Sequence, residues 1–386
     1  MLKIPEKTEY VINTLIKNGY EAYIVGGCVR DMLLGKVPYD YDVTTSATPD
    51  KVISLFQKTV PTGIKHGTVT VIIDKEPIEV TTYRTDGGYS DNRHPENVTF
   101  VSNLKDDLAR RDFTVNAIAF NSKDGLQDFF DGKNDLENKI LRAVGNPQRR
   151  FSEDALRILR LFRFASVLNF TIEKETLSAA IDLSHNLENI SRERIAAELK
   201  KAVMGNNVSA LEPLISCGGL SFLDITKIPE FNIIQRSNKK EKLAFFSFFY
   251  LSDCDVLKIS QSLKLSNQYK AYFEKMLALC ESYFPQTKEE IKEMLKTSSP
   301  EIFKDYLDFC NAKGINTETQ NAMLSEILEN NEPYLISHLK INGKDLEELG
   351  FKNLEIGEKL ELLRKTAIKN PKNNTRKKLL EILNNL

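Results

Sequence analysis

Residues 23–45, YIVGGCVRDMLLGKVPYDYDVTT, combine a pair of glycines with two aspartates that a single residue separates. Asp40 and Asp42 lie in a segment, 40–45, whose alternation predicts a β-strand, and positions i and i+2 of a strand share one face. Two carboxylates this close repel each other unless a cation lies between them, and hard oxygen ligands select Mg²⁺. We therefore predict that Asp40 and Asp42 are catalytic and bind Mg²⁺. Two such ions would activate an attacking hydroxyl and stabilise a leaving pyrophosphate.

The glycine pair lies between an apolar run, 22–25, and a short predicted helix, 29–34. Missing side chains let backbone N–H groups approach phosphates, and a helix N-terminus favours anions. Arg30, on the first turn, could bind a triphosphate oxygen. The sequence has neither GxGxxG nor GxxxxGK[ST], so it lacks the Rossmann and P-loop motifs. A lone glycine pair is usually a turn, but its combination with the two aspartates indicates a nucleoside-triphosphate site for nucleotidyl transfer.

The elements around these residues predict an α+β head with a mixed sheet, followed by an all-α remainder. Strand patterns stop at about residue 149, and strong helical periodicity follows. Residues 84–97 hold Gly, Asp, Asn, Ser and Pro with almost no apolar content and predict a mobile loop. The head elements are helices near 7–17, 48–56 and 102–110, and strands near 22–25, 40–45, 68–73, 78–83 and 115–120.

Composition limits the classes of protein that remain. A chain of 386 residues is long enough for two or more domains, and its net charge of −1 means that any nucleic-acid partner must meet local basic patches. The five cysteines are scattered and form no CxxC, which favours a reducing cytoplasm. Four separate histidines give little support for zinc, and the longest apolar run, 243–251, is too short to span a bilayer.

Four motifs follow one another in the first half of the chain and a fifth lies near its end. They are GGCVRDMLLGKVPYDYDVTT (26–45), RRDFTVNAIAF (110–120), DGKNDLENKILRAVG (131–145), RRFSEDALRILRLFRFA (149–165) and INGKDLEELGF (341–351). The first four resemble the polymerase-β-like nucleotidyltransferases, in particular class II CCA-adding enzymes and bacterial poly(A) polymerases. The fifth is similar to the C-terminus of CCA-adding enzymes of the Gram-positive bacterial type. The resemblance implies a catalytic nucleotidyltransferase head (1–148), a helical neck that selects the base (149–206), a helical body (207–330) and a helical tail that binds tRNA (331–386).

The resemblance also implies roles for residues of the head. Gly27 and Arg30 match positions that contact the triphosphate. Arg111 and Asp112 match a motif that contacts the ribose and phosphates of the incoming nucleotide. An aspartate can accept from ribose hydroxyls and an arginine can hold phosphate, although a helix end whose cations complement the dipole is the simpler interpretation of this motif taken alone. Glu79 could add a third acidic group, but a solvated strand glutamate is an equally good interpretation.

Asp154 and Arg157 lie three residues apart in a predicted helix, 153–168, and would share one face. The simple interpretation is a salt bridge within the helix, worth about 0.2–0.5 kcal/mol. The resemblance implies instead that the pair recognises the base: the aspartate accepts from an exocyclic amine while the arginine donates to a ring nitrogen or carbonyl. Cytosine and adenine fit this polarity, and guanine and uracil do not. Arg160 and Arg163 continue the basic stripe and would lie near the nucleotide, although a solvated face is the default interpretation of Arg163 alone.

We therefore expect a cytoplasmic CCA tRNA nucleotidyltransferase that adds C, C and A from CTP and ATP, with Mg²⁺, to the tRNA 3′ end. The full loop at 83–101, which could re-aim the base-selecting pair, and the absence of a long basic extension favour this activity over a poly(A) polymerase or a partial CC- or A-adding enzyme. An RNA-binding module with an inactive head is the non-enzyme alternative. The acceptor and elbow of tRNA would meet the helical half, where 364–378 holds seven Lys or Arg and no acid. We expect no membrane partner, and a homodimer is left open.

Overall fold

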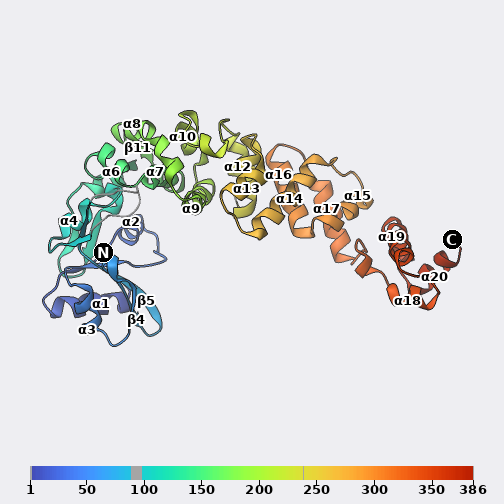
Figure 1. Cartoon of the computed structure of the whole chain (residues 1–386), viewed down its shortest axis with the longest axis horizontal. Helices are drawn as coiled ribbons and strands as arrows, with labels where there is room; N and C mark the ends of the chain where they lie inside the picture. The colour runs from blue at the N-terminus through green and yellow to red at the C-terminus, as the bar shows by residue number, and fades with distance from the viewer. Residues whose placement is uncertain (1, 88–97, 238, 386) are drawn as a thin grey trace. The chain divides into compact units, whose positions relative to one another are not determined.

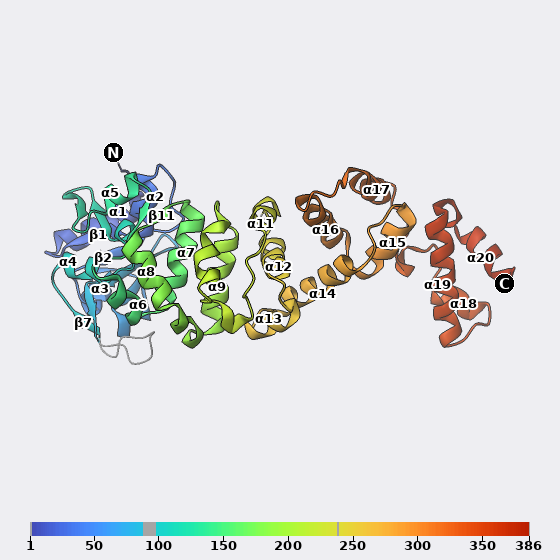
Figure 2. The ribbon, with the colours of Figure 1, turned by 90° about the horizontal axis from the view of Figure 1, so that it is seen from above.

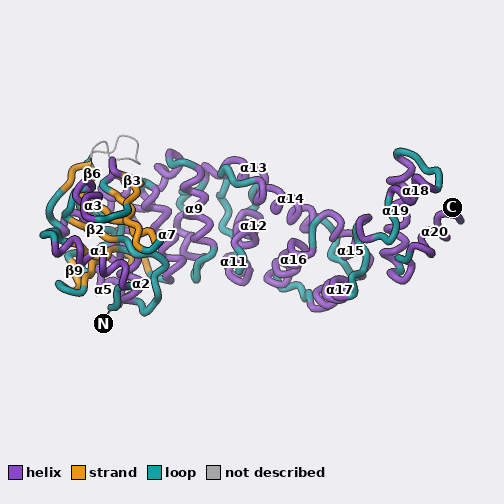
Figure 3. The backbone as a smooth tube through the Cα atoms, turned by 90° about the horizontal axis from the view of Figure 1, so that it is seen from below, coloured by secondary structure: helices purple, strands orange, loops and turns teal. Residues whose placement is uncertain are grey.

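The computed structural model describes residues 2–87, 98–237 and 239–385, and contacts between Cα atoms group the chain into two compact units. The first unit, Met1–Ile228, contains every strand of the described chain (Figure 3, orange), and the described part of the second unit, Pro229–Leu386, is helical. This arrangement confirms the predicted α+β class. The division into head, neck, body and tail stays a prediction, and most of the predicted loop at 84–97 lies outside the described residues.

A seven-stranded mixed sheet forms the centre of the first unit (Figure 1). The strand order is β3-β4-β5-β2-β1-β8-β9, in which β2 and β5 are parallel and the other neighbours are antiparallel. Asp74 and Lys75 both adopt positive φ between β4 and β5, as a two-residue hairpin turn requires. The strands are β1 Ala22–Val25, β2 Val43–Thr45, β3 Thr59–Gly63, β4 Thr68–Ile73, β5 Glu76–Thr82, β8 Ile118–Asn121 and β9 Gly125–Asp128, and a separate pair joins β6 Arg84–Asp86 to β7 Val98–Phe100.

Helices cover both faces of this sheet. In β1, Ala22 and Ile24 point into one hydrophobic core, while Tyr23 and Val25 point into the other. The first core also contains side chains from α1 (Glu6–Lys17), α2 (Gly27–Leu33) and α3 (Pro49–Leu55), and the second contains side chains from α4 (Leu104–Ala109). Because β1 is buried on both sides, the turn that follows it is held at a fixed place on the edge of the sheet.

Helix α7 (Leu156–Leu168) is the central helix in the rest of the first unit. It packs along α9 (Arg192–Val203), as Figure 2 shows, and the Ser166 hydroxyl on α7 donates to the carbonyl of Ala202 on α9 at 2.6 Å. A short parallel pair, β10 (Ile140–Leu141) with β11 (Thr171–Ile172), corrects the prediction that strands end before residue 149. The remaining helices here are α5 Gly132–Glu137, α6 Pro147–Glu153, α8 Lys174–Asp182 and α10 Glu212–Ser216.

The second unit is built around α12 (Glu241–Leu251), which is apolar on all sides. Its four phenylalanines at 245, 246, 248 and 249 are fully buried, so the apolar run at 243–251 is a core helix. Within the described residues, no helix combines the length and the apolar character that crossing a membrane would need. The other helices are α11 Phe231–Ser237, α13 Val256–Ser262, α14 Asn267–Glu281, α15 Lys288–Thr297, α16 Pro300–Ala312, α17 Glu318–Glu329, α18 Gly343–Glu348, α19 Leu354–Lys369 and α20 Arg376–Asn384.

Three predicted boundaries near the motifs are wrong. The strand predicted at 40–45 begins at Val43, so Asp40 and Asp42 precede it. The strand predicted at 115–120 is a 3₁₀ turn, Thr114–Asn116, followed by β8. The helix predicted at 153–168 is interrupted at Asp154, which has extended backbone angles (φ −143°, ψ 105°) and separates α6 from α7.

Candidate active site

Asp40 and Asp42 lie at the entrance to β2, and both side chains are exposed. The carbonyl of Asp42 accepts from the amide of Val25 at 3.0 Å, so the backbone of Asp42 stays paired with the end of β1. Within the described chain, no Lys, Arg or His forms an ion pair with either carboxylate. Partial desolvation, together with the charges of Asp40 and Glu79, raises the pKa of Asp42 above its usual range, while Arg111 opposes this shift. The charge of Asp40 therefore destabilises the charged form of Asp42.

The donor set at this edge fits magnesium. Within the described residues, no group of three or more His, Cys, Asp or Glu side chains is close enough to enclose a metal ion. Mg²⁺ differs from zinc in this respect, because it usually keeps several waters and binds through one or two carboxylates plus substrate phosphates. Two mutually repelling carboxylates just before β2, with no cationic partner in the described chain, match that mode of binding.

The turn after β1 requires glycine at Gly26. Its φ of 80° and ψ of −127° lie in a region that side chains exclude, and a Cβ there would be 2.7 Å from Nη1 of Arg111. Gly27, the predicted triphosphate contact, is half-exposed and begins α2. Gly26 thus lets the Arg111 guanidinium lie directly against the turn, a role that the sequence analysis did not assign.

Arg30 and Arg111 lie in different electrostatic environments. Arg30 is buried, and it donates to Oδ1 of Asn116 at 2.7 Å and to Asp31 at 2.8 Å. Burial lowers the pKa of Arg111, although the charges of Asp107 and Asp42 favour its charged form. The Nε of Arg111 has no hydrogen-bond partner in the described part of the chain. An arginine with spare donor capacity beside a glycine turn and two carboxylates is suited to bind an anionic ligand.

Asp112 is buried and fully bonded. Its Oδ2 accepts from Nε and Nη2 of Arg160 at 2.9 and 2.6 Å, and its Oδ1 accepts from Nδ2 of Asn116 at 3.1 Å. Burial alone would raise the pKa of Asp112, but the charge of Arg160 and the bond from Asn116 outweigh burial and lower it. Because Asn116 also accepts from Arg30, this amide links Arg30 to Asp112 and Arg160.

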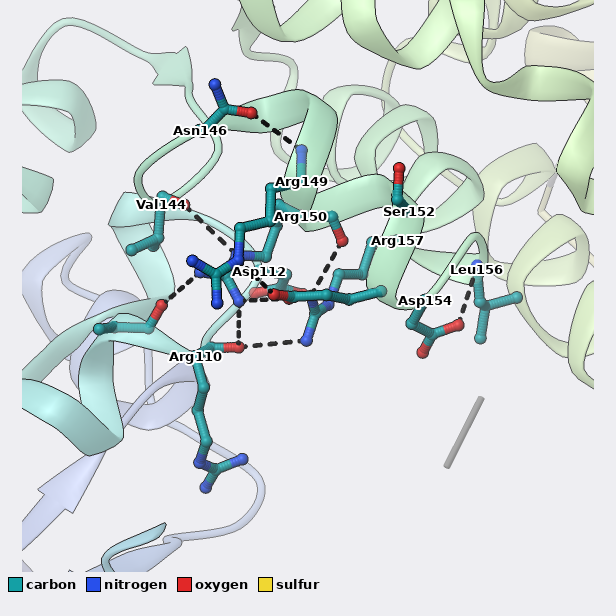
Figure 4. Close-up of polar contacts among 12 residues, drawn as sticks. Arg110, Asp112, Val144, Asn146, Arg149, Arg150, Ser152, Asp154, Leu156 and Arg157 are labelled. Carbon is teal, nitrogen blue, oxygen red and sulfur yellow. Dashed lines mark hydrogen bonds and ion pairs between the residues drawn. The ribbon is translucent and has the colours of Figure 1, made fainter. Parts of the chain in front are cut away.

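The side chains of Asp154 and Arg157 do not bond to each other, so the predicted salt bridge and the shared helical face are both wrong. Their backbones do bond, because the Arg157 amide donates to the Asp154 carbonyl at 3.0 Å. Figure 4 shows Arg157 directed toward the carbonyl of Arg110, at 3.2 Å, and away from Asp154. Arg157 also donates to Glu153 at 2.7 Å. The oxygens of Asp154 accept from the Leu156 amide at 3.0 Å and from Nη2 of Arg194 at 2.9 Å. The helix break at Asp154 produces this separation.

Arg163 is largely buried, which corrects the default interpretation of a solvated side chain. Its side chain is 12% exposed, and its Nε lies 2.5 Å from Oε2 of Glu198 on α9. The same carboxylate group lies 3.9 Å from Nη1 of Arg160. Glu198 therefore balances the charge of α7 from the neighbouring helix.

Several residues of this site were missed by the sequence analysis. Asp107 is fully buried; it binds Arg110 at 2.9–3.0 Å and accepts from the Thr44 hydroxyl at 3.0 Å. Its spacing of i, i+3 and i+4 before the arginine pair was a usable signal. Asn116, Arg194 and Glu198 carried no such signal, because only the tertiary fold brings them to their partners.

The mixed sheet, the glycine turn and the paired carboxylates define a nucleotidyltransferase head. Residues 22–142 match the family model described as the Poly A polymerase head domain, and residues 169–223 match the one described as the probable RNA and SrmB-binding site of polymerase A. The chain is 36% identical to the CCA-adding enzyme of Ligilactobacillus salivarius over 93% of this chain and 91% of that protein. On this evidence the chain belongs to the family of CCA-adding enzymes.

Two further comparisons agree. The CCA-adding enzyme of Oceanobacillus iheyensis is 51% identical over 203 residues, a match that covers 53% of this chain and spans about half (51%) of that relative. The crystal structure of the Bacillus stearothermophilus CCA-adding enzyme in complex with CTP aligns with a TM-score of 0.83 and 29% identity over 99% of this chain and 98% of that one. The first similarity is concentrated in part of the chain, and the second extends over nearly all of it.

Proposed function

We propose that this protein is a CCA tRNA nucleotidyltransferase that adds C, C and A from CTP and ATP to the 3′ end of tRNA and releases pyrophosphate. The observation that carries this proposal is the pair of exposed carboxylates, Asp40 and Asp42, beside a glycine turn and the desolvated Arg111. The similarity of almost the whole chain to CCA-adding enzymes supports the same reaction. All five cysteines are free, which supports a location in the cytoplasm.

In the proposed reaction, the primer 3′ hydroxyl attacks the α-phosphorus. A P–O bond forms there, the bond to the bridging oxygen of pyrophosphate breaks, and the hydroxyl proton passes to solvent. Bound by Asp40 and Asp42, Mg²⁺ would supply charge neutralisation at the reacting phosphate and activation of the hydroxyl. Gly27, Arg30 and Arg111 would hold the triphosphate, and Asp112 would accept from the ribose in exchange for one of its two bonds from Arg160. Positioning and electrostatic stabilisation carry most of the rate enhancement in this class of reaction.

Base selection remains assigned to Asp154 and Arg157 in this proposal. Asp154 is half-buried, and each oxygen that already accepts one hydrogen bond keeps a lone pair for an exocyclic amine. Arg157 would turn a donor toward the ring nitrogen beside that amine. Guanine and uracil would place a carbonyl against Asp154, and each unpaired buried group would cost about 1–3 kcal/mol. This polarity supports selection of CTP and ATP without a template.

We assign tRNA binding to the second unit, with a smaller basic surface than the sequence indicated. Arg364 is fully buried and bonded to Glu293 and Glu361, so it is not available to phosphates. Arg376 is paired with Asp345. The exposed cations that remain in 364–378 are Lys365, Lys369, Lys372, Lys377 and Lys378. We propose that these lysines contact the RNA backbone.

An incorporation assay tests the proposed function. Purified protein is incubated with Mg²⁺ and a tRNA that ends before CCA, with CTP alone, ATP alone or both, and product lengths are resolved on a sequencing gel. We expect addition of two nucleotides with CTP, of three with both, and then arrest. Addition of A without C would contradict the proposal and indicate poly(A) polymerase activity. The match of residues 22–142 to the Poly A polymerase head domain is the reason for testing this alternative. If no nucleotide is added, the alternative of an RNA-binding module with an inactive head would be favoured.

A further inference from the structure

The ring of Phe164, on α7, lies among three guanidinium groups. The central carbon of Arg163 is 3.6 Å from the ring centroid, that of Arg30 is 5.2 Å away and that of Arg160 is 5.5 Å away. Phe164 is only 5% exposed, so the ring is largely shielded from solvent. Arginines within about 6 Å of a ring centroid are attracted by its quadrupole, most strongly where they are desolvated.

Phe164 connects segments that are far apart in the sequence. Arg30 belongs to α2, after the glycine turn, whereas Arg160 and Arg163 belong to α7. Phe113, which directly follows the Arg111–Asp112 motif, packs edge-to-face on the same ring with centroids 5.7 Å apart at 81°. One aromatic side chain of α7 therefore contacts both segments to which the proposed function assigns the nucleotide phosphates and ribose, and it also contacts two arginines of its own helix.

The carboxylates near these arginines do not by themselves fix their positions. Each arginine has an acidic partner of its own: Asp31 for Arg30 at 2.8 Å, Asp112 for Arg160 at 2.6 Å and Glu198 for Arg163 at 2.5 Å. Glu198 also lies 3.9 Å from Arg160, and Asn116 links Arg30 to Asp112, but none of these groups contacts all three guanidinium groups. Like charges repel one another, and the Phe164 ring is a contact that all three cations share.

We propose that Phe164 is a positioning residue that holds Arg30, Arg160 and Arg163 together as a binding cluster for the triphosphate of CTP and ATP. This inference rests on the proposed function, and it adds that Phe164 acts on the binding of the triphosphate group. The cluster recognises phosphate oxygens whatever the base, because guanidinium donors match phosphate geometry. Loss of the ring should therefore weaken CTP and ATP equally and leave discrimination against UTP and GTP unchanged.

The test compares Phe164→Leu with Phe162→Leu. Phe162 lies on the same helix and is fully buried, and in the described chain no arginine lies over its ring. Both changes open a similar cavity, but only the first removes the contact with the arginines. Phe164→Tyr keeps the aromatic ring and serves as the conservative variant. Phe164→Met removes the ring but keeps most of the side-chain volume, so it replaces Phe164→Leu if the leucine variant does not fold. Binding of CTP and of inorganic tripolyphosphate is measured by calorimetry without tRNA, and KM and kcat are measured with tRNA.

We expect Phe164→Leu to weaken CTP and tripolyphosphate roughly tenfold each, through KM more than kcat, on the scale of cation–π contacts. Phe162→Leu should change both by less than about twofold, and Phe164→Tyr should retain most of the affinity. Equal effects of the two leucine variants would overturn the inference, as would weakened CTP binding with unchanged tripolyphosphate binding. If the wild-type protein binds both ligands in the expected pattern but does not extend tRNA, the proposed function fails while the role of Phe164 stands.

Discussion

Both units of this protein bury charged side chains, but the surroundings of those charges differ. In the second unit, Nη2 of Arg364 donates to Glu293 and Glu361 at 2.7 Å each, and Nζ of Lys292 lies 2.6 Å from Glu332 and 3.1 Å from the carbonyl of Ile368. Among the described residues of that unit, no buried side-chain nitrogen or oxygen lacks a hydrogen-bond partner. These charges are satisfied by the fold itself, and they join α15 to α19 and to the segment between α17 and α18.

The first unit leaves part of its charge unsatisfied. Asp40 and Asp42 have no ion-pair partner in the described chain, and buried nitrogens of Arg111 and Arg194 have no hydrogen-bond partner there. Burial of charge is thus common to the structural network and to the proposed ligand site, whereas unpartnered buried nitrogens at Arg111 and Arg194 distinguish the ligand site. In the described chain, buried polar atoms without a partner are confined to the first unit, where Tyr83 and Arg192 also have one.

Asp42→Asn should lower kcat on the order of 10²–10³-fold or more, because the metal-binding pair loses a charge directed at the reacting phosphate. The folded protein should not lose stability, because partial desolvation and the Asp40 charge raise the pKa of Asp42, so that its charge is a cost to folding. Single-turnover extension and urea-induced unfolding measure the two effects. Asp50→Asn, an exposed carboxylate on α3, is the matched control; if it lowered kcat equally, the role of Asp42 would not be specific.

Arg364→Met should lower stability and leave catalysis unchanged, which is the opposite of the effect expected for Asp42→Asn. We expect a loss of about 2–3 kcal/mol in the free energy of unfolding, below the roughly 3–5 kcal/mol of a fully buried pair because Glu293 and Glu361 reach solvent. The rate of extension of a short primer should change by less than about twofold, since the network has no spare capacity for a ligand. Arg376→Met, whose own side chain is exposed, should cost at most about 1 kcal/mol in the same measurement. A catalytic defect in Arg364→Met would contradict the assignment of Arg364 to a purely structural network.

Asp112→Asn should destabilise the protein in a pH-dependent way. The folded pKa of Asp112 lies below its unfolded value of about 3.9, so the ionised carboxylate stabilises the fold fully above that pH. Its contribution fades as pH falls below about 4 toward the lowered folded value. The difference in urea midpoint between wild type and variant should be constant from pH 5 to 7 and narrow in acid. The exposed Asp106→Asn should show no such trend; a gap that widened in acid would contradict the assignment.

Arg194→Met should reduce the preference for CTP over UTP about tenfold, because Asp154 loses the donor that fixes its Oδ2. The ratio of kcat/KM values for the two nucleotides measures this effect. Arg192→Met, on the same helix but stacked over Phe222, should leave the ratio unchanged. A fall in kcat/KM that is equal for CTP and UTP would assign Arg194 a purely structural role.

The smallest effect concerns the exposed lysines of 364–378. Replacing Lys369, Lys372 and Lys377 by alanine should lower tRNA affinity and reduce the dependence of log K on log salt by about 0.7–0.9 for each lost phosphate contact. Filter binding at several salt concentrations gives this slope. Lys51→Ala, an exposed lysine on α3, should leave it unchanged. An unaltered slope in the triple variant would show that these lysines do not contact RNA phosphates and that tRNA binds to another surface.

The sequence predicted the elements whose periodicity is strong and the motifs whose residues are local. The boundaries of β1 agree with the prediction, and the carboxylate pair, the glycine turn and the arginine motifs all come from one unit. The break at Asp154 was not predictable, because 149–168 has continuous helical periodicity and the interruption is stabilised by contacts with Arg194 and Arg110 from other elements. Arg364 was misassigned for a similar reason, since its acidic partner Glu293 is distant in sequence.

Crystals of the protein with CTP and Mn²⁺, a substitute for Mg²⁺ with an anomalous signal, would show whether Asp40 and Asp42 bind the metal beside the triphosphate. We expect an anomalous peak about 2.0–2.2 Å from oxygens of both Asp40 and Asp42, with the triphosphate against Arg30, Arg111, Arg160 and Arg163. We expect no nucleotide at Arg364. A triphosphate bound away from the first four arginines, or a peak that touches neither carboxylate, would show that the proposed site is wrong.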